Sequence, residues 1–185
     1  MYKRQQHNVI VPAARLFYFD GSMAGVPLQG YHRYVDGAAS MLVRLAALIP
    51  VARASGDEMT RSETVTLFND MCVLAPATLV SPAITWEPVD AQRARARFTN
   101  GGHTIAAELS FGAGAELGDF QSDDRSRAAP DGQLERVRWS TPLGACRPFG
   151  QVRLASTGEG RWHERAGNYA YIELTIDDVR YNVRP

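Results

Sequence analysis

The sequence predicts an α+β protein in which a mostly antiparallel sheet packs on one main helix. Two observations carry this prediction. Residues 92–111 read as two alternating strands joined by a tight turn, whereas only residues 60–74 repeat their apolar side chains at helical spacing. A length of 185 residues is typical of a single domain.

The strand pair over residues 92–111 is the element that the sequence specifies best. A turn at residues 100–102 contains two glycines, which adopt positive φ readily. This turn sets a register that pairs Phe98 with Ile105 on an apolar face and Arg95 with Glu108 on a charged face. One apolar and one charged face are typical of an antiparallel hairpin with solvent on one side.

The one main helix is expected over residues 60–74. Thr60-Arg61-Ser62-Glu63 resembles a capping box, in which Thr60 and Glu63 satisfy each other's backbone amides. Pro76 ends the helix, and a short helical turn follows through Leu79. A broad apolar stripe on this helix must pack against another element. It consists of Val65, Leu67, Phe68, Met71, Cys72 and Leu74.

The rest of the chain reads as further strands separated by loops. Loops are expected over residues 21–30, which hold three glycines and a proline, and over the polar residues 122–132. Strands are expected over residues 15–19, 31–35, 40–48, 116–121, 134–141, 151–163 and 169–183.

Composition argues against several classes of protein. Lys+Arg is 20 and Asp+Glu is 20, so the chain lacks the basic excess of a nucleic-acid-binding domain, and we expect no nucleic-acid partner. No apolar run is long enough to span a membrane. The four histidines are far apart and the two cysteines form no C-x-x-C pair, so we predict no metal and no cofactor. The composition does not distinguish a location in the cell envelope from one in the cytoplasm, and it does not predict an oligomeric state.

One arrangement of residues would make the protein a hydrolase. Cys72 or Ser62 would be the nucleophile, with His103 or His163 as its base. The alternative, which we favour, gives the helix residues structural roles: Cys72 packs inward as a free thiol, and Asp70 lies on the solvent side. No catalytic residue is therefore predicted.

Several segments resemble a bacterial family known only as a domain of unknown function. The most specific is the helix segment, residues 61–79 (RSETVTLFNDMCVLAPATL). The others are residues 31–35 (YHRYV), 86–90 (WEPVD), 97–105 (RFTNGGHTI) and 122–125 (SDDR), with Tyr181-Asn182 near the end. The resemblance covers most of the chain from about Arg15 onward. It implies no established activity and no catalytic residue.

The order of strands and helix is similar to the open half-barrel of periplasmic lipoprotein carriers. In that architecture a curved antiparallel sheet wraps around helices and leaves an apolar cavity. Members of the resembled family usually carry further N-terminal strands, so this chain is expected to lack its native N-terminus. Residues 1–5 (MYKRQ) resemble a recurrent artefact at the ends of reading frames from metagenomic assemblies. Residues 6–185 are then the single domain.

Three functions are open at this level. The first is a non-catalytic half-barrel that binds a lipid or another apolar ligand. The second is a structural or envelope-associated protein whose sheet edges pair with a partner, and the third is the hydrolase described above. The binding protein is preferred because no convergent set of polar residues is evident. Its cavity would be lined by Phe68, Met71, Cys72, Trp86, Phe98, Leu109 and Trp139.

Overall fold

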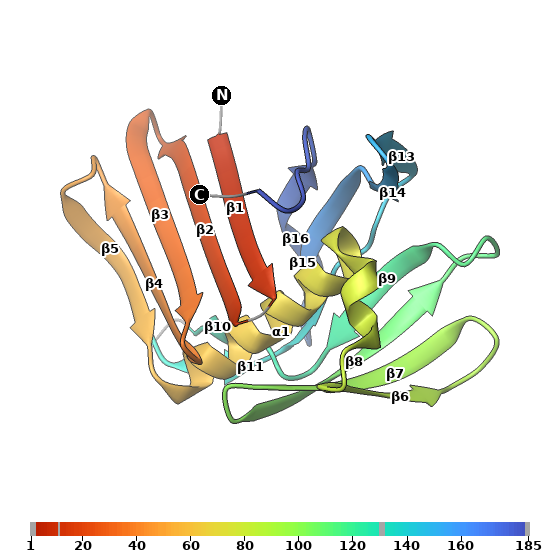
Figure 1. Ribbon diagram of the computed structural model, residues 1–185. Coiled ribbons are helices and arrows are strands. Elements are labelled where there is room, and N and C mark those ends of the chain that lie inside the picture. Colours follow the sequence, from red (N-terminus) through yellow and green to blue (C-terminus); the bar gives the residue numbers. More distant parts are fainter. Residues whose placement is uncertain (1–2, 11, 130–131, 184–185) are drawn as a thin grey trace.

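The computed structural model describes residues 3–10, 12–129 and 132–183, and it confirms the α+β class. Two antiparallel sheets lie on either side of one main helix, α1 (Asp57–Leu74) (Figure 1). Sheet A contains, in spatial order, β1 (Lys3–Ile10), β2 (Ala13–Met23), β3 (Val26–Val35), β4 (Ala38–Leu45) and β5 (Ile49–Ser55).

Sheet B is larger and does not follow chain order. From one edge to the other it contains β16 (Gly167–Thr175), β15 (Thr157–Glu164), β12 (Arg138–Ser140), β9 (Leu117–Ser122), β8 (His103–Phe111), β7 (Arg93–Asn100) and β6 (Ile84–Pro88). Two short hairpins and a 3₁₀ helix complete the fold. They are β10 (Ser126–Ala128) with β11 (Leu134–Arg136), β13 (Cys146–Phe149) with β14 (Val152–Ala155), and η1 (Pro76–Val80).

Sheet A is a meander with tight turns. Residues 24–25 connect β2 to β3 and residues 36–37 connect β3 to β4, and all four have positive φ. The predicted loop over residues 21–30 is therefore wrong, because β2 and β3 stay paired out to Met23 and Val26. A glycine inside this pairing makes room for an aromatic ring: a Cβ built on Gly30 would lie 1.9 Å from the Phe19 ring.

The first residues of the chain belong to sheet A where the structure describes them. Residues 3–5 open β1 and pair with residues 18–20 of β2. Met1 and Tyr2 lie outside the described residues. The assignment of residues 1–5 to an assembly artefact, and the loss of native N-terminal strands, stay predictions.

The helix α1 begins three residues before its predicted start, and the capping box is wrong. Gly56 is the N-cap, with φ 97° and ψ −173°. The Thr60 hydroxyl donates to the Gly56 carbonyl at 2.9 Å and accepts from the Ala39 amide at 3.1 Å. The Glu63 side chain binds sheet A instead of the helix backbone. Because α1 begins at Asp57, Thr60 lies inside its first turn and not at the N-cap, so the capping box cannot form.

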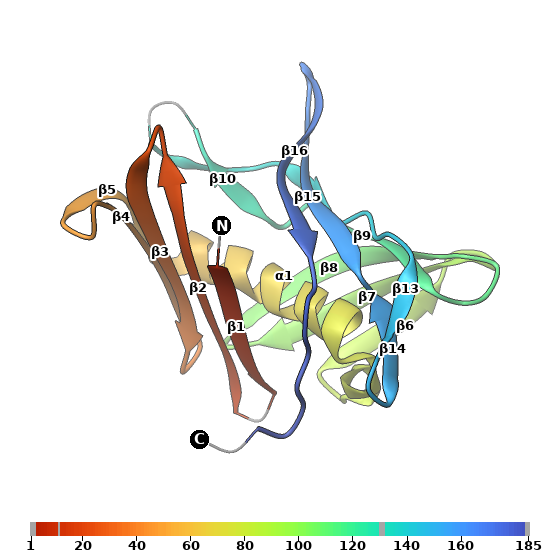
Figure 2. The same ribbon diagram turned by 90° about the horizontal axis from the view of Figure 1, so that it is seen from above.

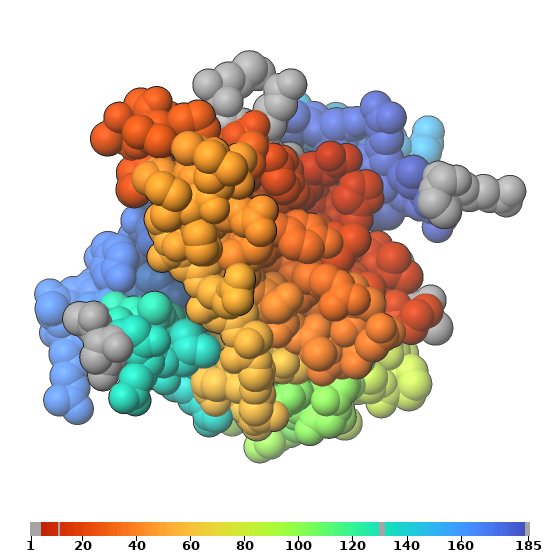
Figure 3. All heavy atoms as spheres, turned by 90° about the vertical axis from the view of Figure 1, so that its left-hand side faces the viewer, coloured from red at the N-terminus to blue at the C-terminus, as the bar shows by residue number. Residues whose placement is uncertain are grey.

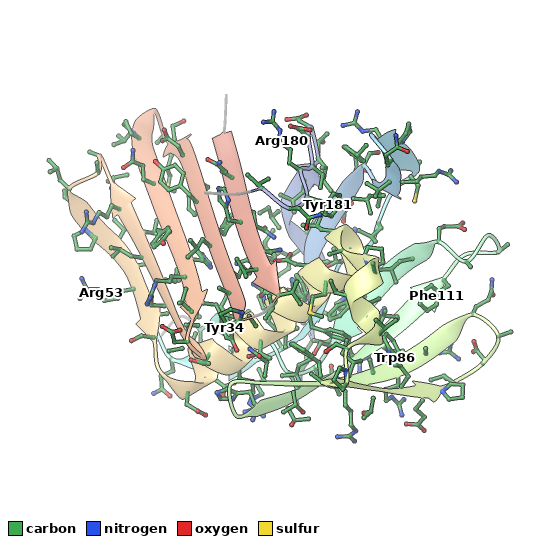
Figure 4. The ribbon with its side chains drawn as sticks, in the orientation of Figure 1. Tyr34, Arg53, Trp86, Phe111, Arg180 and Tyr181 are labelled. Carbon is green, nitrogen blue, oxygen red and sulfur yellow. The ribbon has the colours of Figure 1, made fainter. Side chains whose placement is uncertain are left out.

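The helix α1 is enclosed on almost every side and runs between the two sheets (Figure 2). Thirteen of its eighteen residues are buried. Its apolar face packs on sheet B, where Phe68 stacks on Phe98 with ring centres 5.1 Å apart and meets Phe120 edge-on. Its polar face packs on sheet A, from which the buried Tyr34 points toward the helix (Figure 4). The expectation that Asp70 faces solvent is therefore wrong.

The hairpin of β7 and β8 has the predicted register. Phe98 pairs with Ile105 and Arg95 pairs with Glu108. Phe98 and Ile105 are buried against α1, while Arg95 lies exposed on the outer face. The alternation of apolar and charged residues therefore predicts both the pairing and the face that becomes the core.

Other strand predictions hold in part. The strands β5, β6 and β13 each contain a proline and β1 is mostly polar, so the sequence pattern does not indicate them. Four predicted segments are divided or altered. Residues 134–141 break at Val137, residues 151–163 break at Ser156, residues 169–183 end as a strand at Thr175, and residues 122–132 contain β10.

Sheets A and B are joined through α1. Strands of sheet A pack closely on α1. The two sheets also touch directly at one end, where Asn100 of β7 donates to the Tyr34 hydroxyl of β3 and the turn at Gly37 approaches the turn at Gly101. Figures 1 and 2 show the sheets diverging beyond α1, with β1 and β16 at edges that face each other. Figure 3 looks onto the outer face of sheet A. The single curved sheet expected from the sequence is thus two sheets, open rather than closed into a barrel.

Candidate binding site between the two sheets

A buried ion-pair cluster joins sheet A to α1. Arg15 of β2 donates from Nε to Asp70 Oδ2 at 2.6 Å and from Nη1 to Glu63 Oε2 at 2.9 Å. Glu63 and Asp70 are seven residues apart and so lie on one face of α1, two turns from each other. Only 6% of Arg15 and 1% of Glu63 is exposed. We call Arg15, Glu63 and Asp70, with the polar side chains that contact them, the Arg15 cluster.

Polar side chains of β1 and β3 complete the Arg15 cluster. Gln6 donates to Asp70 Oδ2 at 2.7 Å, and Asn8 donates to the same oxygen at 3.4 Å. His32 Nδ1 lies 3.6 Å from Glu63 Oε1. Three neighbouring strands of sheet A therefore converge on one face of α1.

The Arg15 cluster keeps its charges despite burial. Burial alone would raise the pKa of Glu63, but the charge of Arg15 and a hydrogen bond from His32 lower it to about 2. Burial disfavours the charged form of Arg15, and the two carboxylates nevertheless raise its pKa above the usual value. A charged pair in a region of low dielectric requires this mutual compensation.

A second cluster faces α1 from sheet B. The guanidinium of Arg125 lies 4.3 Å above the Trp139 ring and 5.5 Å from the Trp162 ring. Its Nη1 donates to the Tyr171 hydroxyl at 2.8 Å, and Tyr171 stacks on Trp162 with ring centres 5.6 Å apart. The charge of Arg125 also lowers the pKa of Glu63, so the two clusters face the same interior. We call these four residues the Arg125 stack.

Aromatic side chains extend the inner face of sheet A beyond the Arg15 cluster. Phe17 and Phe19 follow Arg15 at alternate positions of β2, so all three point to the same side. The Phe17 ring packs edge-on against His32, with centres 5.8 Å apart. Phe17 and Phe19 are only half-buried. Figure 1 shows β2 continuing well past α1, so this end of the inner face lacks helix cover.

A hollow of about 210 Å³ lies on the outer face of sheet B, not between the sheets. Asp123 accepts two hydrogen bonds from Arg138, at 2.8 and 2.9 Å, and Glu108 lies 3.5 Å from Arg95. These ion pairs make its wall polar, which suits water better than an apolar ligand. It is lined by Arg95, Ala106, Ala107, Glu108, Gln121, Ser122, Asp123, Asp124 and Arg138.

The structure brings the predicted ligand-binding residues together, mostly as packed core. Six of the seven belong to one buried cluster, namely Phe68, Met71, Cys72, Phe98, Leu109 and Trp139. The seventh, Trp86, is 41% exposed and contacts Phe68 at a ring-centre distance of 6.3 Å, while Phe68 also stacks on Phe98. A role for the seven residues in lining a ligand cavity stays a prediction.

The hydrolase candidates do not come together. Burial raises the pKa of the Cys72 thiol, and both cysteines are free. Ser62 exchanges hydrogen bonds with the backbone of Ser126, His103 lies 3.4 Å from an Asp57 oxygen, and His163 contacts Ser140. In the described part of the chain, therefore, neither Cys72 nor Ser62 has a histidine as its hydrogen-bond partner. Those residues also include no group of three metal-ligating side chains and no helix able to cross a membrane.

Four residues of this site were not indicated by sequence reasoning. Glu63 and Asp70 carry a usable signal, because their spacing of seven places both on one helical face. Arg15 carries a weaker one, as a charge within a short apolar strand. For Arg125 the sequence offers only the family resemblance of residues 122–125, since the polar segment around it reads as a solvated loop.

The fold and the site define a class of protein in which one helix is enclosed between two open antiparallel sheets and faces a charged and aromatic interior. This chain belongs to the family of unknown function DUF6544, whose model matches residues 1–174. The comparisons with curated proteins and with solved structures gave no match.

Proposed function

We propose that this protein is a non-catalytic binding protein that holds a lipid or another apolar ligand between sheets A and B. The observation that carries the proposal is the half-buried aromatic end of the inner face of sheet A, at Phe17 and Phe19. Tyr171 of sheet B, which is 45% exposed, lies on the facing edge strand. Covering apolar area of this kind is favourable by about 25 cal/mol per Å², so a ligand placed there gains affinity.

The chemistry of the interior agrees with binding rather than catalysis. In the Arg15 cluster one guanidinium pairs with two carboxylates through short contacts, and Glu63 stays ionised at neutral pH. Groups that are fully paired in this way stabilise the floor of a site and take no proton from a substrate. The Cys72 thiol is likewise held in its unreactive neutral form.

The proposal is tested by tryptophan quenching with a brominated long-chain alcohol, an uncharged probe. We expect saturable quenching in the wild-type protein, and its loss in Phe19→Glu, because a carboxylate at that position repels the apolar chain. Tyr18→Glu is the matched control, since Tyr18 is the neighbouring residue on the opposite, exposed face of β2.

The quenched residue is then located by substitution. Trp162→Phe should remove most of the quenching if the ligand lies beside β16. Loss of the quenching in Trp86→Phe, at the far edge of sheet B, would instead place the ligand against the predicted lining residues. An absence of saturable quenching, or equal losses in Phe19→Glu and Tyr18→Glu, would overturn the proposal. Native mass spectrometry of gently purified protein would then identify the class of any natural ligand.

A structural role is the second candidate. It is favoured by the long edge strand β16, in which eight of nine residues are exposed, including Tyr169 and Leu174. Such an edge offers unpaired backbone groups to another strand. Light scattering across a concentration series separates the two candidates, because strand pairing with a second copy raises the mass while ligand binding does not.

A further inference from the structure

The segment Ser122-Asp123-Asp124-Arg125 fixes the direction of its arginine. The Ser122 hydroxyl donates to the Ala106 carbonyl at 2.7 Å and accepts from the Asp124 amide at 3.1 Å. Asp124 in turn accepts from the Ala106 amide at 2.8 Å. A serine hydroxyl bonded to an amide two residues ahead is a local turn that competes with continued strand. The chain therefore leaves β9 here and presents Arg125 to the interior.

Arg125 differs from Arg15 in making no ion pair with a described residue, although its charge is near enough to Glu63 to lower the pKa of that carboxyl. Over the described residues no carboxylate lies within 4 Å of its guanidinium, whereas Arg15 contacts two. Its neighbours are the faces of Trp139 and Trp162 and the hydroxyl of Tyr171. Aromatic faces attract a cation but do not neutralise it. The Arg125 stack therefore retains a positive charge among apolar rings.

Two hydrogen-bond donors of the Arg125 stack have no acceptor. Arg125 Nε and Trp139 Nε1 are both shut off from solvent and without a partner, and Trp139 is only 4% exposed. Unpaired buried donors are rare in native proteins, and each one calls for an explanation such as a bound ion or ligand. Both donors belong to the same cation–aromatic contact. A single negatively charged group bound there would supply hydrogen-bond acceptors for both.

We propose that Arg125 binds the oxyanion head group, a carboxylate or a phosphate, of the ligand held between the sheets. This inference rests on the proposed function. A guanidinium that stacks by its face keeps its N–H groups at the edge, where they match the geometry of an oxyanion. The exposed Tyr171 marks the side from which the head group enters, and the apolar chain then lies against the aromatic walls.

The test compares three brominated probes of one chain length: the alcohol, the fatty acid and the alkyl phosphate. We expect the wild-type protein to bind at least one anionic probe tenfold or more tightly than the alcohol. Arg125→Gln should remove that preference and leave affinity for the alcohol unchanged. Arg138→Gln is the matched control, because Arg138 lies on the outer face of the same sheet, paired with Asp123. It should keep the wild-type preference.

Each outcome decides between the two proposals. Preference for the acid identifies a fatty-acid-like head group, and preference for the phosphate a phospholipid-like one. Equal affinity for all three probes in the wild-type protein overturns the role of Arg125 and leaves the proposed function standing, whereas binding of none overturns both. Should Arg125→Gln fail to fold, Arg125→Lys replaces it. Lysine keeps the positive charge but lacks the planar guanidinium that can donate two parallel hydrogen bonds. Arg125→Lys should therefore weaken the preference for the anionic probes without abolishing it.

Discussion

At the scale of single residues, Arg15 makes the contacts on which the interior depends most. It crosses from β2 to α1 and compensates two carboxylates that are largely buried. Removing one partner of a buried ion pair costs far more than the pair contributes, because the remaining charge loses its compensation. Exposed ion pairs behave differently, since water replaces the lost partner.

We therefore expect Arg15→Met to lower the free energy of unfolding by about 3–5 kcal/mol. Arg93→Met is the control, because Arg93 pairs with Asp90 while its side chain is 48% exposed, and this substitution should leave the free energy of unfolding almost unchanged. Urea unfolding followed by tryptophan fluorescence measures both. An equal loss in the two variants would show that the buried ion pairs of Arg15 contribute no more to the free energy of unfolding than an exposed pair does.

Residues also show where prediction from sequence succeeds and fails. Phe98 and Ile105 could be paired in advance because a glycine turn and strict alternation leave one register. Asp70 could not be placed, because a polar helix residue faces solvent unless something covers it. The cover is sheet A, whose edge strands lack apolar alternation. The candidate site was missed for the same reason, since it lies where the two sheets meet α1.

At the scale of elements, the junction between β5 and α1 depends on one glycine. Gly56 has φ 97° and ψ −173°, a combination that residues with a Cβ scarcely adopt. This conformation lets an edge strand turn directly into a helix that runs beneath its own sheet. The Gly56 carbonyl then accepts both the Thr60 amide and the Thr60 hydroxyl.

Substitution of Gly56 should consequently strain the start of α1. We expect Gly56→Ala to cost about 1–3 kcal/mol of stability, although nothing stands within 4 Å of the added Cβ. Gly118→Ala in β9 is the matched control, because its φ is ordinary and its Cβ would lie 3.6 Å from the Ser110 carbonyl oxygen. Thermal unfolding should show a lower Tm for the first variant only. A loss in both would point to packing rather than backbone strain.

At the scale of the whole molecule, α1 packs against both sheets. Two of its acidic side chains bind different neighbouring elements. Glu63 binds Arg15 of sheet A. Glu58 accepts hydrogen bonds from Arg136 of β11 and from Ser126 of β10. The Arg136 hydrogen bond is the main reason that the pKa of Glu58 falls to about 2, and the pKa of Glu63 is lowered equally.

These two lowered pKa values predict loss of stability in acid. A carboxyl whose pKa is lower in the folded protein stabilises it fully above the unfolded value near 4.5, and that contribution disappears as the pH falls toward 2. For Glu63 the contribution is on the order of 3 kcal/mol, and for the more exposed Glu58 it is smaller because water screens the pair.

Urea unfolding between pH 6 and pH 2 should therefore show the stability falling below pH 4.5. Glu63→Gln should be less stable at pH 6 and fall less steeply, while Asp178→Asn, at an exposed pair, should follow the wild type. A wild-type stability that stays level from pH 4.5 to pH 2.5 would contradict the view that ionised carboxylates hold α1 against sheet A and the β10–β11 hairpin.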